Sequence, residues 1–348
     1  MLFGHGSDIY KYQETVIADF SSNVWYKGMQ ESLIRHLQDK VINIVHYPAP
    51  DAGKLSKKIA DLHSLNHQNI LVTNGATEAF YLLAQLHAGL NSYVVYPGFA
   101  EYEDACKIYN HKLHYVCNAE FHAEIPLKQY ALVWIGNPNN PDGKVISKEN
   151  IWDLCKNNPD TIFIVDEAYA ELCWKFDSVI HLVNKLNNLI VVRSLTKAFA
   201  IPGIRLGYLV APVRIIEKAK TVKMPWSVNM LAIEAGIFIL ADYYNLLPEK
   251  NMVVKESKTL QKELACIPGI KIYPSDCNYF LGSIESGKAC NLKQFLLESY
   301  GLLIRDASNF RGLNESYFRI AVQKPEFNIL LVNAIKQWIN NKNHSENE

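Results

Sequence analysis

The chain has 348 residues, 49% apolar and 20% charged, so it can bury a sizeable core and is long enough for two domains. Lysine plus arginine equals aspartate plus glutamate, at 35 each. This zero net charge argues against a nucleic-acid surface, whose signature is a basic excess.

Between Ser56 and Leu240, short apolar runs alternate with helical patterns. Several runs are apolar on successive residues, as expected of strands that are covered on both faces. The alternation predicts an α/β fold with a mostly parallel sheet. The predicted strands are Ile70–Thr73, Ser92–Tyr96, Leu132–Ile135, Thr161–Val165, Leu189–Val192 and Gly207–Ala211. The predicted helices are Ala76–His87, Glu101–Tyr109, Lys148–Asn157 and Arg214–Lys220.

From about Ala241 the pattern changes to a long helix, three short strands and a terminal helix. These elements are predicted at Leu247–Ile267, Ile270–Tyr273, Tyr279–Ser283, Tyr317–Val322 and Pro325–Asn340. We therefore predict a large domain at residues 30–240 and a smaller α+β domain formed by residues 1–29 with 241–340. The polar residues 341–348 are predicted to be a frayed tail.

The seven cysteines are odd in number and form no C-x-x-C pair. Their scatter argues against structural disulfides and a zinc site, and predicts free thiols in a reducing compartment. The first residues lack the cationic and apolar regions of a signal peptide, and no stretch approaches the roughly 18 apolar residues that span a bilayer. We expect a cytoplasmic protein with no metal and no membrane or nucleic-acid partner.

The residues that follow the predicted strands are the first candidates for a site, because ligands of open α/β sheets bind at the carboxyl ends of strands. Gly75-Ala76-Thr77 opens a helix and suits a phosphate, although a plain helix cap explains it equally well. Two Asn-Pro steps follow the third strand, and so many amides predict a hydrogen-bonding role for one of them.

Two further strand ends carry charged side chains. Asp166 ends a buried strand, where a carboxylate needs a cationic partner unless it only caps a helix. Lys197 and Arg205 lie among small and apolar residues, which lower the pKa of a lysine and make its amine a nucleophile toward an aldehyde. Pyridoxal phosphate needs the groups that these strand ends offer: a phosphate-binding turn, an amide, a carboxylate, and a lysine with an arginine.

These motifs resemble the class I/II aminotransferase family of fold-type I pyridoxal-phosphate enzymes. The resemblance extends from Tyr47 to Val322, and the motifs occur in the same order as in the family. The branch with histidinol-phosphate aminotransferase and threonine-phosphate decarboxylase is the most similar. The resemblance implies that Lys197 forms the Schiff base with the cofactor and that Asp166 pairs with its ring nitrogen. Its other implied cofactor contacts are Tyr169 and Asn140 on the phenolate, Ala168 and Tyr102 on the ring, and Gly75, Ala76, Thr77, Ser194 and Arg205 on the phosphate.

For the substrate, the resemblance implies that Arg319 holds a carboxylate and that Arg305 and Arg311 hold a phosphate. Ordinary surface ion pairs remain the alternative for the last two. Asn23 lies in a segment beside the substrate in this branch, where Trp25 and Tyr26 replace the usual turn and could reshape the pocket. His5 resembles the opening of the threonine-phosphate decarboxylases and is a candidate substrate contact, with a mobile terminus as the alternative.

The resemblance predicts a threonine-phosphate decarboxylase-like enzyme of cobalamin side-chain synthesis. A histidinol-phosphate aminotransferase or another amino-acid transaminase is the alternative. Tyr47 matches a tyrosine that reaches the neighbouring subunit's cofactor phosphate, which implies a homodimer with shared active sites. A ligand-sensing regulator would need a DNA-binding domain, and a nicotinamide oxidoreductase a glycine-rich loop; the sequence has neither.

Overall fold

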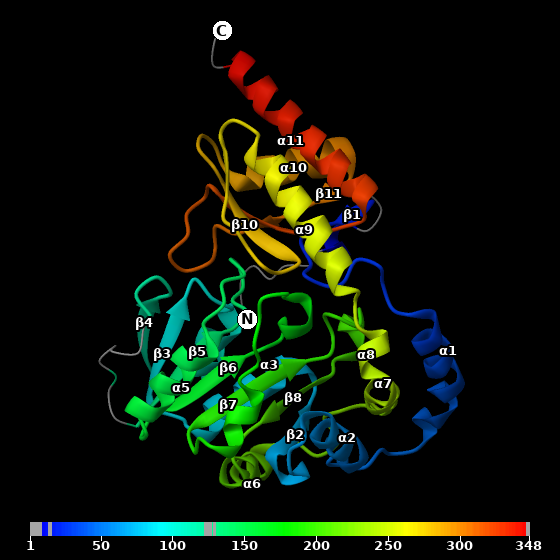
Figure 1. Cartoon of the computed structure of the whole chain (residues 1–348), viewed down its shortest axis with the longest axis vertical. Helices are drawn as coiled ribbons and strands as arrows, with labels where there is room; N and C mark the ends of the chain where they lie inside the picture. The colour runs from blue at the N-terminus through cyan, green and yellow to red at the C-terminus, as the bar shows by residue number, and fades with distance from the viewer. Residues whose placement is uncertain (1–8, 13–15, 122–126, 128–129, 346–348) are drawn as a thin grey trace.

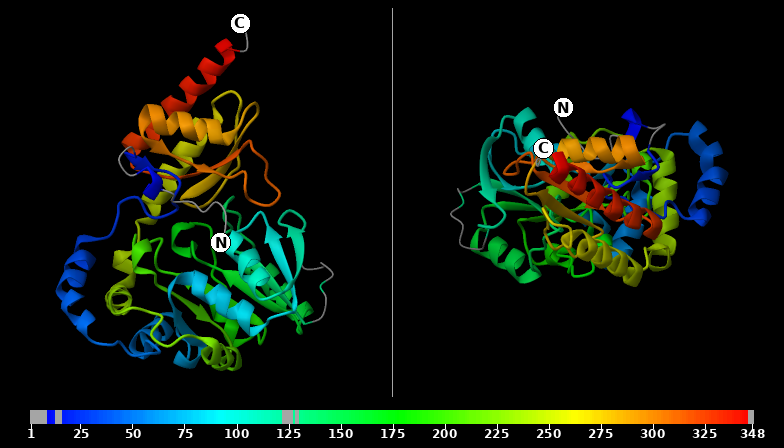
Figure 2. Two further views of the ribbon diagram at one scale, coloured as in Figure 1. Left: turned by 180° about the vertical axis from the view of Figure 1, so that it is seen from behind. Right: turned by 90° about the horizontal axis from the view of Figure 1, so that it is seen from above.

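The structure is a computed structural model that describes residues 9–12, 16–121, 127 and 130–345. It consists of a larger body around a seven-stranded sheet and a smaller body above it, from which the C-terminal helix projects (Figure 1). The view from behind shows the same separation, and in the view from above the smaller body lies over the larger one (Figure 2).

The large sheet has the strand order β2-β8-β7-β6-β5-β3-β4. β8 runs antiparallel to both β2 and β7, and all other neighbouring strands are parallel. The prediction of an α/β fold with a mostly parallel sheet is therefore confirmed. The strands are β2 (Ile70–Thr73), β3 (Asn91–Tyr96), β4 (Lys112–Cys117), β5 (Ala131–Gly136), β6 (Ile162–Asp166), β7 (Leu189–Ser194) and β8 (Gly207–Val210).

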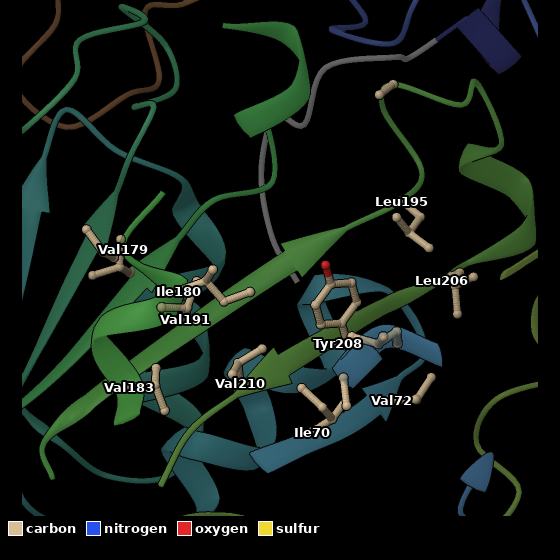
Figure 3. Packing of buried hydrophobic residues seen from close by; sticks show 14 of the residues in the cluster. Ile70, Val72, Val179, Ile180, Val183, Val191, Leu195, Leu206, Tyr208 and Val210 are labelled. Carbon is tan, nitrogen blue, oxygen red and sulfur yellow. The ribbon is translucent and has the colours of Figure 1, made fainter. Parts of the chain in front are cut away.

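Both faces of this sheet are buried, which explains why its central strands are apolar on successive residues. In β7, Leu189 and Val191 join one hydrophobic cluster, while Ile190 and Val192 join the cluster on the opposite face. Figure 3 shows the first cluster, where Val191 lies near Tyr208 and Val210 of β8. The larger body's helices are α1 (Glu31–Lys40), α2 (Gly53–His63), α3 (Gly75–Leu86), α4 (Ala100–Ile108), α5 (Lys148–Asn157), α6 (Val213–Val222), α7 (Met230–Ala241) and α8 (Tyr243–Leu246).

Several elements of the larger body escaped prediction: the helices α1, α2, α7 and α8 and the strand β4. The edge strand β4 mixes polar and apolar residues, so it shows neither the continuous nor the alternating pattern of a strand. Helix α7 is apolar around most of its circumference, so it shows no helical periodicity.

The smaller body contains an antiparallel sheet in the order β12-β13-β10-β9 and a parallel pair of β1 with β11. Its elements are β1 (Ala18–Asp19), α9 (Lys250–Ala265), β9 (Ile270–Ile272), β10 (Tyr279–Ile284), α10 (Ala289–Tyr300), β11 (Leu302–Leu303), β12 (Arg305–Asp306), β13 (Tyr317–Ala321) and α11 (Pro325–Ser345). Since β1 pairs with β11, Ala18–Asp19 joins this body. The division at residues 1–29, 30–240 and 241–340 stays a prediction.

One boundary differs from the prediction. Helix α11 continues to Ser345, so residues 341–345 are helical instead of belonging to a frayed tail. The polar residues beyond Asn340 include no glycine or proline, and polarity alone does not end a helix.

In the described part of the chain, no single helix is long and apolar enough to span a membrane. One pair, Met230–Ala241 with Tyr243–Ala265, meets the length and composition criteria together but is bent by 104°. Among the same residues, no group of three or more histidine, cysteine, aspartate or glutamate side chains is placed to hold a metal ion.

Candidate active site

Three adjoining cavities lie beyond the carboxyl ends of β5, β6 and β7, and all three are lined by Phe99 and Asn140. The lysine cavity, of about 90 Å³, contains Lys197 and Asp166. The central cavity, of about 300 Å³, is lined by both Lys197 and Arg319. The outer cavity, of about 630 Å³, is lined by Arg319, Arg305 and Arg311. Predicted cofactor and substrate residues from distant parts of the sequence therefore share one continuous space.

Lys197 follows β7 and lines both the lysine cavity and the central cavity. Burial removes water from its ammonium group, and the positive charges of Arg205 and Arg319 repel it, so that the pKa of Lys197 falls to about 8. Its amine is therefore substantially neutral near pH 8, which is the form that attacks an aldehyde. The structure thus gives Lys197 the environment that the sequence predicted for it.

Asp166 ends β6, and both of its carboxylate oxygens are held. One accepts a hydrogen bond from the backbone N–H of Ala168 (3.0 Å), and the other accepts one from the hydroxyl of Tyr102 (2.6 Å). Burial raises the pKa of Asp166 to about 6, against the opposing effects of these two bonds and of Lys197. A cation placed in the lysine cavity would offset this cost of burying the carboxylate.

Tyr102 lines the lysine cavity, where its hydroxyl is bonded to Asp166. Its side chain is almost fully buried at 2% exposure, and its ring packs against Phe80 and Trp134. That Tyr102 lies over the cofactor ring stays a prediction. Phe99, just before α4, lines all three cavities. Sequence reasoning missed Phe99 because both residues are aromatic, and only packing decides which rings border a cavity.

The turn before α3 forms one end of the lysine cavity. Ala76 and Thr77 line it together with Ser194 and Arg205, and the side chain of Asn74 forms no cap bond at this helix N-terminus. The plain-cap alternative therefore fails for Asn74. Gly75 has φ +71°, and a Cβ at this position would lie 2.4 Å from Nη2 of Arg205, so only glycine lets the arginine approach. Backbone N–H groups, a hydroxyl and a guanidinium converge there, as a phosphate requires.

The asparagines after β5 divide into two roles. Asn137 bonds to the backbone of Ile146 in both directions (3.0 and 2.9 Å), and Asn139 bonds to Pro97 O (2.9 Å) and Asp142 (2.7 Å). These two side chains shape the turn. Asn140 instead faces the cavities, which matches the prediction that one amide has a hydrogen-bonding role.

Arg319, on β13 of the smaller body, is buried with 4% exposure. It donates to Asn140 Oδ1 (2.6 Å) and to the backbone oxygen of Ser21. Burial lowers the pKa of Arg319, while Tyr169, Tyr279 and Asp19 act in the opposite direction. No described carboxylate forms an ion pair with this guanidinium, although buried arginines ordinarily have such a partner.

Tyr169 lines the lysine and central cavities, and its ring lies 4.8 Å from that of Tyr279. Burial raises the pKa of Tyr169 despite the opposing effects of the nearby Arg319 charge and the Asn23 amide. The phenol therefore stays protonated and can donate a hydrogen bond. Asn23 itself lines the central cavity, as predicted for a substrate contact.

The other two predicted phosphate ligands differ from each other. Arg305 is buried, donates to Asn309 (2.7 Å) and lies over the Phe310 ring (5.5 Å). Arg311 is half exposed and makes a bidentate ion pair with Glu103 of α4 (3.1 and 2.8 Å). Arg311 thus matches the ordinary ion-pair alternative, although it still lines the outer cavity.

The family description "Aminotransferase class I and II" matches residues 17–335 of the chain. The chain belongs to this family. It is 35% identical over 331 residues to histidinol-phosphate aminotransferase of Thermoanaerobacter pseudethanolicus, covering 89% of this chain and 90% of that protein. It is also 31% identical over 334 residues to threonine-phosphate decarboxylase of Salmonella typhimurium, covering 92% and 90%. The crystal structure of L-threonine-O-3-phosphate decarboxylase from Porphyromonas gingivalis matches with a TM-score of 0.90 and 38% identity, covering 93% of this chain and 100% of that one.

Family membership confirms that the chain is a pyridoxal-phosphate-dependent enzyme. The residues fit that group, because the lysine cavity of about 90 Å³ is bordered by Lys197 with its lowered pKa and by the buried carboxylate of Asp166. It is also bordered by the N-terminus of α3 together with Arg205. The individual roles remain predictions.

Four residues singled out in the sequence lie away from this space or outside the described structure. Tyr47 is 87% exposed on the larger body and lines none of the three cavities. The Trp25 ring packs into the larger body's core, and Tyr26 lies outside these cavities, so neither reshapes the pocket in this structure. His5 lies outside the described residues.

Proposed function

We propose that this enzyme acts on a phosphorylated amino acid and that decarboxylation of threonine phosphate is its reaction. Transamination of histidinol phosphate is the alternative. Relatives with both names match over most of the chain at similar identity, so the comparisons leave this choice open.

The observation that carries the proposal is the pair of buried arginines along one continuous space. Arg319 lies between the central and outer cavities without a carboxylate partner among the described side chains, and Arg305 lines the outer cavity. A bidentate ligand carboxylate would offset the cost of burying the Arg319 guanidinium. A second anionic group on the same ligand would then lie toward Arg305, which suits a phosphate ester better than a simple amino acid.

In this site the cofactor, when bound, supplies the electron sink for the bond that breaks at the substrate Cα. Asp166 would keep a proton on the ring nitrogen, and Asn140 and Tyr169 would donate to the ring oxygen. Arg319 would orient the substrate carboxylate and with it the bonds at Cα. Lys197 would carry a proton at Cα, and Phe99, which lines all three cavities, would border the bound group.

The reaction is tested by incubating the purified enzyme with threonine phosphate, with and without 2-oxoglutarate. The proposal predicts carbon dioxide release that does not depend on the keto acid. Turnover of histidinol phosphate that requires 2-oxoglutarate would favour the aminotransferase. A plain amino acid that shifts the cofactor absorbance when neither phosphate ester does would refute the phosphate assignment.

We also propose a homodimer with shared active sites. The 3-10 helix η2 (Val41–Val45) exposes several large apolar side chains, and next to it the exposed Tyr47 ring contacts Trp226, itself 49% exposed (5.6 Å). Trp226 Nε1 also donates to Pro48 O (3.1 Å), which fixes the two segments together. A contiguous apolar surface of this kind is typical of a subunit interface. A second copy would cover this surface and bring Tyr47 to the partner's site.

Subunit complementation tests the shared site. Tyr47→Phe, with weak cofactor binding, and Lys197→Ala are each expected to be nearly inactive alone and to regain activity after subunit exchange. Full activity from a species of monomer mass by light scattering would refute the dimer. The cytoplasmic location and the absence of membrane and nucleic-acid partners stay predictions.

A further inference from the structure

Two buried cysteines face each other where the larger and smaller bodies meet. Cys173 follows the 3-10 helix η4 (Ala170–Leu172) of the larger body, and Cys277 precedes β10 of the smaller one. They form an isolated antiparallel bridge and belong to one hydrophobic cluster with Tyr169 and Tyr279 of the candidate active site.

The backbone around this bridge has the geometry of a non-hydrogen-bonded antiparallel pair. Trp174 N donates to Asp276 O (3.0 Å), and Asn278 N donates to Leu172 O (3.1 Å), so the bonds flank the two cysteines and none joins them. The Cα atoms of such a pair lie about 4.5 Å apart, with side chains on the same face. That separation falls within the range of roughly 4.4 to 6.8 Å found across disulfides.

The Cys277 thiol donates a hydrogen bond to the backbone oxygen of Gly143 (3.7 Å), and its proximity lowers the pKa of Cys173, against the effect of burial. Burial raises the pKa of Cys277, as it does for the buried Cys106 and Cys155. No second cysteine faces Cys106 or Cys155 in the described structure, so the placement of two cysteines opposite each other distinguishes the bridged pair.

We propose that Cys173 and Cys277 are an oxidisable pair whose disulfide joins the two bodies beside the active site. The oxidant is a small disulfide of the glutathione type. The Cys173 thiolate attacks it and releases one glutathione thiolate; the Cys277 thiolate then attacks the mixed disulfide and releases the second. Two electrons pass to the oxidant, and the two thiol protons end on the two reduced glutathiones.

The bond would restrain the part of the smaller body that contributes to the site. Cys277 is two residues before Tyr279, whose hydroxyl donates to Asn139 O (2.8 Å). β10 pairs directly with β13, and Leu281 lies opposite Arg319 in that ladder. We therefore expect the oxidised enzyme to turn over more slowly and to recover when it is reduced.

The test uses the full-length holoenzyme with the exposed Cys266 and Cys290 changed to serine, so that surface thiols do not consume the reagent. The enzyme is equilibrated with oxidised glutathione, the remaining thiols are alkylated, and the peptides are mapped by mass spectrometry. We expect one linked peptide pair, Cys173 with Cys277, the loss of two thiols per chain, and reversal by dithiothreitol.

Cys277→Ala should abolish the linkage and the sensitivity of turnover to oxidant, whereas Cys155→Ala, at a buried thiol with no cysteine opposite, should retain both. Cys173 and Cys277 that both remain alkylatable, or that carry glutathione without being linked, would overturn the proposal. If the fully linked enzyme turns over as fast as the dithiol enzyme, the proposed effect on catalysis is wrong. The peptide mapping uses enzyme in which Cys173 and Cys277 are both present, so it still tests the linkage if Cys277→Ala folds poorly.

Discussion

Replacing Tyr102 with phenylalanine removes one hydroxyl and with it one of the two hydrogen bonds to Asp166. This O–H to carboxylate bond is short at 2.6 Å and fully buried, and a bond to a charged group of this kind contributes about 1.5–3 kcal/mol. One pKa unit corresponds to about 1.4 kcal/mol. The pKa of Asp166, already raised to about 6 by burial, should therefore rise by a further one to two units, roughly, in the variant.

The assay is the affinity of the apoenzyme for pyridoxal phosphate as a function of pH. Asp166 supports the ring nitrogen only as a carboxylate, so affinity falls as pH falls through its pKa. The titrations of the cofactor itself are common to both proteins, and the difference between them isolates Asp166. For Tyr102→Phe we expect this fall to begin about one to two pH units higher and affinity at pH 7 to be lower by about two- to tenfold.

Tyr208→Phe is the matched control, because Tyr208, on β8, is also fully buried but its hydroxyl bonds to His63 (2.8 Å). It should lose stability without moving the pH dependence. If Tyr102→Phe binds the cofactor with the wild-type pH profile while remaining folded, Tyr102 does not hold Asp166 in its charged form.

Three further predictions concern other residues of the site. The rate at which Lys197 reacts with the cofactor's aldehyde should rise with pH and level off above about pH 8, because burial lowers the pKa of Lys197 from its ordinary value to about 8. Borohydride fixation should label Lys197 alone, and Lys197→Ala should abolish both the reaction and the label. Arg319→Lys should raise KM for the substrate by about ten- to a hundredfold with cofactor affinity unchanged, since a lysine lacks the bidentate fork; an unchanged KM would remove Arg319 from the carboxylate site. Burial would raise the pKa of Glu103, but bonds from Arg311, Lys107 and Tyr115 outweigh it and hold that pKa at about 2. Glu103→Gln should therefore release Arg311 and tighten phosphate-ester binding by up to about fivefold, as expected for a partly exposed pair, with no change for substrates that lack phosphate. In the control variant Glu31→Gln, which breaks the exposed pair with Arg35 on α1, the binding of both kinds of substrate should be unchanged.

The local sequence was sufficient wherever one segment contains the whole signal. β2 and α5 begin and end at the predicted residues, since an apolar run bounded by turn residues, or a helical pattern after a capping serine, needs no distant partner. The same holds for the positions of Lys197 and Asp166 at strand ends. Their placement in one cavity follows from the shared edge of a mostly parallel sheet.

The tertiary structure decided what depends on contacts between distant segments. The sequence could not show that Tyr102 bonds to Asp166 in the lysine cavity or that Phe99 lines all three cavities, because both are aromatic and only packing selects their directions. Nor could it show that Arg311 pairs with Glu103, 208 residues away in the sequence. The same holds for Arg319, which has no carboxylate partner among the described residues. Chain periodicity fixes which face of an element a side chain occupies, but its partner is set by how the elements pack, and in this protein that packing determines which arginines can meet an anion.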